Sequence, residues 1–325
     1  MAESSSLDCT KHPCITPIPP LPRPSKELPD AFRVTPLLPE EASFRHSGWV
    51  NRRRLVWDAL ERISASASRL DRFGNCGSGC YVQYSATAEA VRLTASFCRD
   101  RLCQPCGRAR SRLIADNLCR HCIGKTVRFA TFTLKHNVTP LKDQIRRLYA
   151  AFVALRRRRV WRQHVAGGCA VLEVKIGQDD RWHVHLHTLI EGTFIEQRLL
   201  SSEWHAVTGD SYIVDVRRLS GTDKEIRYVA SYCGKPLDAT LFSRPVQTDE
   251  FARAIRGTRI ISTFGTWRGL DVDALDPSAP TDWQSVGSLR ELLADAKRGD
   301  PWAVSLLGLL ASRTQEISLC PADTS

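Results

Sequence analysis

Residues 182–190 read WHVHLHTLI, and this stretch decides the fold of the central part of the chain. Apolar side chains alternate with three histidines, and a period of two is typical of a β-strand. The alternation places His183, His185 and His187 on one face of the strand and the apolar side chains on the other. Imidazole is a good ligand for several divalent metal ions. The strand therefore predicts a metal site, with a polar, solvent-facing strand as the alternative.

A second strand is expected just before it, because residues 169–176 read CAVLEVKI and the turn GQDDR follows. A hairpin centred on Asp179 places Glu173 directly opposite His185, where cross-strand neighbours lie about 4.5–5.5 Å apart. Glu173 is thus predicted to join the histidines as a metal ligand. A slip of one residue would turn it to the other face.

The flanking segments alternate between strand and helix patterns. Strands are predicted at 127–134, 169–176, 182–190 and 212–216, and helices at 140–159, 194–205 and 222–233. The order β-α-β-β-α-β-α predicts an α+β fold with a ferredoxin-like antiparallel sheet and helices packed on it.

Four regions are predicted along the chain. Residues 1–47 hold a run of prolines and form an extended or disordered leader. The others are a basic helix with a cysteine-rich module at 48–124, the core at 125–240, and a helical extension at 241–325 with helices at 288–298 and 301–312. The extension is net acidic from residue 271 onward.

Seven of the 12 cysteines lie between residues 76 and 122. Cys98, Cys103 and Cys106 have the spacing of a zinc site, and structural zinc takes four ligands. The candidates for the fourth ligand are Cys76, the first choice, then Cys80, and separately the group Cys119, His121 and Cys122. Free buried thiols and a redox CxxC pair are the other interpretations.

The chain carries 46 Lys and Arg against 35 Asp and Glu, a net charge of +11. Such a balance favours a polyanionic partner, most commonly nucleic acid. The arginines around the cysteine module are candidates for phosphate contacts, with a solvated surface as the alternative: Arg99, Arg101, Arg108, Arg110 and Arg112. The chain has no run of 18 apolar residues and no export-type N-terminus, so we expect no membrane partner and a cytoplasmic location.

Tyr228 and Tyr232 are spaced i, i+4 on a predicted helix and so share a face. A phenol has an ordinary pKa of about 10 and attacks phosphorus well only beside a metal or a cation. Lys235 follows in the sequence as one such cation. Two tyrosines that simply pack in the core are the alternative.

These motifs, in this order, resemble the HUH endonuclease superfamily, specifically the plasmid rolling-circle replication initiators. The matching stretches are FCRDRLCQPC at 97–106, FATFTL at 129–134, HLH at 185–187 and YVASY at 228–232. The resemblance spans roughly residues 70–240 and implies the HUH nuclease fold, an antiparallel sheet like that of RRM domains.

The resemblance also implies a chemistry. Tyr232 is the expected primary nucleophile and Tyr228 its partner, forming a 5′-phosphotyrosine and freeing a 3′-OH that primes replication. Mg²⁺ or Mn²⁺ is expected at His185, His187 and Glu173, with His183 beside them, and structural Zn²⁺ at the cysteines. The implied partners are single-stranded DNA, hairpin origin DNA, and the host helicase and polymerase.

Three rival functions remain open. A Y2-type transposase or a relaxase would use the same residues for the same chemistry. A non-catalytic, zinc-dependent DNA-binding regulator would need the cysteines and arginines but not the histidines and Tyr232 together. A metallohydrolase of small phosphates would need the histidine strand but not the paired tyrosines.

Overall fold

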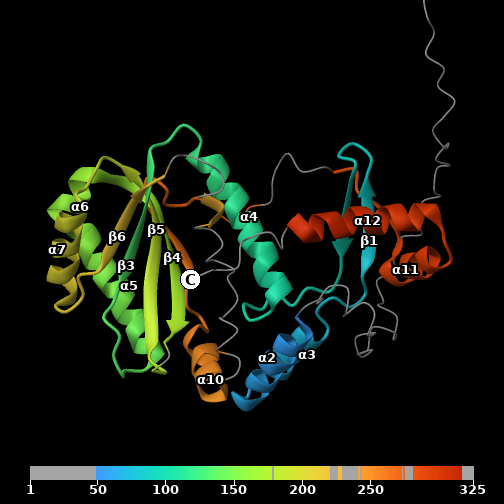
Figure 1. The fold of residues 1–325 in the computed structure, drawn as a ribbon, viewed down its shortest axis with the longest axis horizontal. Helices are drawn as coiled ribbons and strands as arrows, with labels where there is room; N and C mark the ends of the chain where they lie inside the picture. The colour runs from blue at the N-terminus through green and yellow to red at the C-terminus, as the bar shows by residue number, and fades with distance from the viewer. Residues whose placement is uncertain are drawn as a thin grey trace, which may run out of the picture. The chain divides into compact units, whose positions relative to one another are not determined.

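The computed structural model describes residues 49–177, 179–219, 226–228, 241, 244–272, 274 and 281–316. The described chain is a mixed α+β protein with two antiparallel sheets (Figure 1). The five-stranded sheet has the order β6-β3-β5-β4-β7, and the three-stranded sheet has the order β2-β1-β8. The predicted leader, 1–47, lies outside the described residues.

The five-stranded sheet contains the four strands that the sequence predicts and one more. Its strands are β3 Val127–Thr133, β4 Val165–Ile176, β5 Trp182–Gly192, β6 Val214–Arg218 and β7 Ile261–Gly265. Strand β7 pairs with β4 at the edge of the sheet, in a region for which the sequence predicts only helices. A Cβ at Gly168 would lie 2.0 Å from the carbonyl oxygen of Leu189, so this crowded strand requires glycine there.

Helices α5 Leu141–Arg157, α6 Arg159–His164 and α7 Gln197–Thr208 lie on one side of this sheet (Figure 1). Leu148 and Phe152 of α5 share a buried core with Phe132 of β3 and with Val184 and Leu186 of β5. Because Val184 and Leu186 alternate with the histidines, these helices cover the face of the sheet that does not carry the histidines.

Helix α4 Gln104–Cys122 packs on the histidine face, at the end of β5 beyond the histidines. Its Ile114 and Leu118 are fully buried with Val171 of β4 and Leu189 of β5. Within the described residues, no helix is long and apolar enough to cross a membrane.

The region 48–72 forms two helices, α2 Val50–Arg62 and α3 Ala67–Gly74, rather than one. The break falls at Ser64, which has a left-handed backbone with φ of 52°. Helix α10 Pro245–Ala254 packs against α2.

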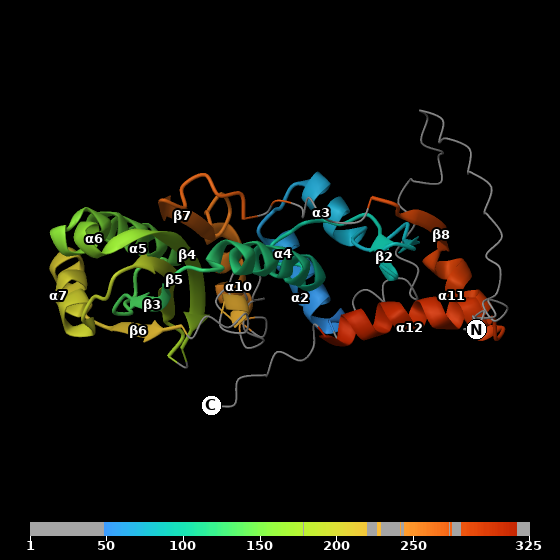
Figure 2. The ribbon, with the colours of Figure 1, turned by 90° about the horizontal axis from the view of Figure 1, so that it is seen from above.

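The three-stranded sheet joins distant parts of the chain. Strands β1 Tyr81–Ser85 and β2 Ala90–Thr94 form a hairpin, and β8 Gln284–Ser288 pairs with β1. Figure 2 shows α11 Leu289–Lys297 and α12 Pro301–Glu316 beside it, and Leu292 and Leu306 share a buried core with Val82. The two helices agree with the sequence prediction, whereas β8 does not, because its partner strand lies about 200 residues earlier.

Candidate functional site

The hairpin of β4 and β5 has the register that the sequence predicts, with Glu173 opposite His185. His183, His185 and His187 follow one another along the same face, with 6.5 Å and 6.3 Å between successive ring centroids. Glu173 and His187 are buried, with 7% and 6% of their surface exposed, and His183 and His185 are half-buried. The histidine strand therefore forms a continuous imidazole row with one carboxylate against it.

Two threonines of β3 hold the imidazoles in place. Thr131 Oγ1 lies 3.0 Å from His187 Nδ1, and Thr133 Oγ1 lies 3.0 Å from His185 Nδ1. A hydrogen bond at Nδ1 sets the orientation of the ring and the position of its proton, so that Nε2 of each ring is the atom that could bind a metal. The resemblance of this Thr-rich strand to a family motif does not by itself reveal the role of its threonines. The sequence signal for these contacts is that Thr131 and Thr133 are two residues apart, as His185 and His187 are.

Glu173 and His187 are paired directly, with 2.8 Å between Glu173 Oε2 and His187 Nε2. Burial alone would raise the pKa of the Glu173 carboxyl, but the hydrogen bond and charge of His187 and the charge of Lys175 lower it below its ordinary value. Lys175 Nζ lies 3.4 Å from Glu173 Oε1. The carboxylate is thus kept ionised, which is the state that binds a metal.

Burial lowers the pKa of His185 to about 4, and the nearby His187, Lys175 and His183 add to this effect. The imidazole is therefore neutral at pH 7, as a metal ligand must be. His183 lies further along the strand, with its ring centroid 4.6 Å from that of His136. Burial, followed by the charge of His136, lowers the pKa of His183 as well.

His185, His187 and Glu173 offer two imidazole nitrogens and one carboxylate oxygen, a donor set that fits a divalent ion such as Mn²⁺. Among the described residues, however, only the four-cysteine group described below has three or more ligand atoms all within 4.8 Å of one another. Glu173 Oε2 instead accepts a hydrogen bond from His187 Nε2. A metal ion at this face would take the place of that hydrogen bond.

Residues 226–228 are helical and lie on the histidine face. The Phe129 ring stacks on His187, with centroids 5.5 Å apart, and meets the Tyr228 ring edge-on at 6.5 Å. Tyr228 is half exposed. The structure therefore brings one predicted tyrosine near the histidines, separated from them by a single ring. Tyr232 and Lys235 lie outside the described residues.

Helix α4 anchors this short segment. Ile226 packs in the same buried core as Ile114 and Leu118, and Arg227 Nη1 lies 2.5 Å from Asp116 Oδ1. This role of α4 is not evident from the sequence, because Asp116 and Arg227 are 111 residues apart and no local pattern links them.

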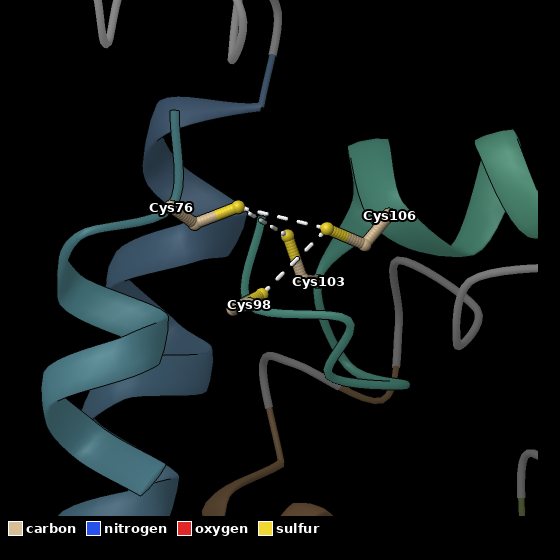
Figure 3. A group of neighbouring side chains, drawn as sticks. All are labelled: Cys76, Cys98, Cys103 and Cys106. Atoms are coloured by element: carbon tan, nitrogen blue, oxygen red, sulfur yellow. Dashed lines mark hydrogen bonds between the residues drawn. The ribbon is translucent and has the colours of Figure 1, made fainter. Parts of the chain in front are cut away.

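Four cysteine side chains converge in the N-terminal part of the described chain (Figure 3). The Sγ atom of Cys76 lies 3.7 Å from that of Cys103 and 3.6 Å from that of Cys106, and 3.7 Å separate Cys98 and Cys106. Zinc–sulfur bonds of about 2.3 Å in a tetrahedron place the sulfurs about 3.8 Å apart. The spacing therefore fits a zinc ion held by four cysteines, including the first choice for the fourth ligand.

Local structure explains the convergence. Cys76 follows the end of α3, Cys103 caps the start of α4, and Cys106 lies in its first turn. The Asp100 N–H donates to Cys98 Sγ at 3.4 Å, and Arg69 binds the Asp100 carboxylate with two hydrogen bonds.

The other candidate ligands lie elsewhere. Cys80 belongs to the core of the three-stranded sheet, and Cys119 and Cys122 belong to the core beneath α4. Hydrogen bonding from Cys103 lowers the pKa of Cys106 to about 6, whereas hydrogen bonds among the thiols and burial raise the pKa of Cys103. A bound cation would favour the thiolate form of the four cysteines, which is the form that binds zinc.

The predicted DNA-binding arginines differ in their surroundings. Arg101 Nη1 donates to the carbonyl oxygens of Ile255 and Thr258. The Arg108 guanidinium lies 4.4 Å from the centroid of the Trp49 ring. Arg99 and Arg112 are exposed, and Arg110 is half-buried. Arg101 therefore supports a loop, and the others stay predictions for phosphate contacts.

Residues 90–288, more than half of the chain, match the replication protein family. The chain therefore belongs to this family, the replication initiators of rolling-circle plasmids. No curated protein and no solved structure matches the chain.

Proposed function

We propose that this replication initiator nicks and rejoins one strand of its plasmid origin through a tyrosine–DNA intermediate. The observation that carries the proposal is the arrangement on one sheet face: His185 and His187 fixed by threonines, Glu173 against them, and the Tyr228 segment one ring away. Neither a DNA-binding regulator nor a small-phosphate hydrolase would need all of these together.

The strand order supports the HUH nuclease fold as the framework. In β6-β3-β5-β4, the first and third strands of the β-α-β-β-α-β unit are central, as in ferredoxin-like sheets. In this framework the histidine strand is one of the two central strands. Its face opposite α5 and α7 is the catalytic face.

In the proposed reaction the Tyr232 phenol oxygen attacks a backbone phosphorus of single-stranded origin DNA. A bond between that oxygen and phosphorus forms, the P–O3′ bond breaks, the phenol loses its proton, and the 3′ oxygen leaves as a hydroxyl. Tyr228 acts as the second nucleophile, which cuts again after one round and allows the ends to be rejoined. The host helicase and polymerase are proposed partners, since the freed 3′-OH must be extended on an unwound template.

His185, His187 and Glu173, with His183 beside them, would hold Mg²⁺ or Mn²⁺, which supplies Lewis-acid polarisation of the scissile phosphate. The chain's own residues set the geometry. Thr131 and Thr133 hold the imidazoles by Nδ1, and the ionised Glu173 balances the cationic site.

The cysteine site is proposed to hold structural Zn²⁺, which would fix the start of α4. Arg99, Arg108, Arg110 and Arg112 around it, with Lys235 near the tyrosines, are proposed to contact DNA phosphates. Such contacts give affinity without reading the sequence.

The test is adduct formation. The protein is incubated with Mn²⁺ and single-stranded DNA carrying the plasmid's origin hairpin, and a covalent protein–DNA product is sought on a denaturing gel. We expect an adduct that chelator, Tyr232→Phe and His185→Ala each abolish. Loss with Tyr228→Phe alone would exchange the two tyrosine roles. Salt-sensitive DNA binding without any adduct would favour the non-catalytic regulator.

A further inference from the structure

A basic groove lies on the side of the five-stranded sheet opposite the histidine row. It has a volume of about 330 Å³ and lies between one face of α5 and residues 258–262, which lead into edge strand β7. Helix α5 packs on the sheet face that carries Leu186, so the groove and the histidines are on opposite sides of the sheet. The groove is therefore separate from the candidate active site.

Four cations line this groove: Lys142, Arg146, Arg156 and Arg259. None of the described residues that line it is a carboxylate. Asp143 on α5 pairs with Arg146 at 2.9 Å, and both side chains are mostly exposed. Burial and then the positive charges of Arg268 and Arg157 lower the pKa of Arg156. Positive charges are thus gathered around the groove, and none of the described residues that line it carries a negative charge to balance them.

The Arg156 guanidinium lies beside two aromatic rings. Its guanidinium carbon lies 5.3 Å from the Phe152 ring centroid and 5.4 Å from that of Phe264. Its Nε atom is buried and has no hydrogen-bond partner within the described parts of the chain. A buried donor without a partner costs about 1–3 kcal/mol. The same guanidinium lines the groove, where its positive charge would attract an anion.

The rim opposite α5 is also held in place. The Tyr149 hydroxyl donates to the carbonyl oxygen of Arg259, and Arg101 donates to those of Ile255 and Thr258. Arg101, which the sequence predicts to contact DNA phosphates, thus positions the segment that carries Arg259. Lys142 and Arg156 are 14 residues apart on α5, about 21 Å along the helix axis. That length spans several phosphates of one strand rather than a single phosphate.

We propose that this groove binds the phosphodiester backbone of DNA on the face away from the nicking site. The proposal rests on the proposed function, in that origin DNA is already the substrate. It adds a second surface, which would hold DNA flanking the nicked strand without reading its sequence. The four positive charges, the half-buried Arg156 guanidinium and the lack of carboxylates among the described lining residues argue for it together.

The test uses the exposed cations, whose replacement leaves the core intact. Binding of the full chain to a short fluorescent duplex of random sequence is measured from about 50 to 200 mM salt. For Lys142→Glu with Arg259→Glu, we expect affinity at least about tenfold weaker and a salt slope smaller by about two, since each phosphate contact contributes about 0.9. The matched control, Arg290→Glu with Lys297→Glu on α11, removes the same charge elsewhere and should change neither the slope nor the affinity beyond about twofold.

Equal loss in the two double variants would overturn the proposal, because the effect would then come from net charge alone. Unchanged binding in the groove variant would overturn it as well. Competition by inorganic phosphate at equal ionic strength that abolishes the groove-dependent part would identify a small-anion site instead. Binding is read without any covalent step, so a failure of adduct formation would refute the nicking function and leave the groove result standing.

Discussion

The hydroxyl of Thr131 offers the sharpest test of how the histidine row is organised. Thr131→Val keeps the shape of the side chain but removes the atom that lies 3.0 Å from His187 Nδ1. His187 is only 6% exposed, so water cannot readily replace the lost partner. Leaving a buried polar nitrogen without its hydrogen-bond partner costs about 1–3 kcal/mol. Loss of such a supporting hydrogen bond typically weakens metal affinity or activity about 10–100-fold.

The assay is a Mn²⁺ titration of the initial rate of adduct formation. We expect Thr131→Val to need about 10–100-fold more Mn²⁺ for half-maximal rate, and Thr131→Ser to restore the wild-type requirement. Thr188→Val is the matched control. Thr188 is also a buried threonine of this sheet, but its side chain lies on the face of β5 opposite the histidines and donates to the Ala130 carbonyl. The control variant should lower the melting temperature without changing the Mn²⁺ requirement. An unchanged requirement in Thr131→Val, or an equal change in Thr188→Val, would refute the reasoning.

Three further predictions follow from the site. Cys103→Ser should release the zinc, measured by metal analysis, and lower the melting temperature by several degrees. The control variant Cys80→Ser should retain the zinc, because Cys80 lies in another core. Zinc retained by Cys103→Ser would contradict the four-cysteine site. The pKa of His185 is about 4 when folded and about 6.5 when unfolded, so the unfolded chain binds more protons between these values and stability should fall as pH drops from 6.5 to 4. His185→Gln should flatten that part of the melting-temperature profile, and an equally steep profile would count against the assignment. Asp116→Arg should slow adduct formation several-fold with a melting-temperature change of only a few degrees, because exposed ion pairs contribute about 1 kcal/mol or less, and the swap Asp116→Arg with Arg227→Asp should recover the rate. No recovery in the swap would show that the pair does not position the tyrosine segment.

Local pattern was sufficient for much of the central sheet. The period of two in WHVHLHTLI and the length of the turn before it predicted both the histidine face and the position of Glu173. A hairpin is short in sequence, so its register follows from neighbouring residues. The spacing of Cys98, Cys103 and Cys106 likewise follows from a short loop and one helix turn, which the sequence displays directly.

Contacts between distant segments were not readable in this way. Nothing local links β8 to β1, Asp116 to Arg227, or the 258–262 segment to α5. The sequence ranked Cys76 ahead of Cys80 as the fourth cysteine, but the meeting of Cys76 with Cys103 depends on where α3 ends relative to α4. The sequence alone thus determined which chemical groups alternate along each strand, because strand and helix periods are local properties of the backbone. Only the tertiary structure decided which threonine, carboxylate or arginine contacts those groups, because such contacts depend on how separate elements pack together.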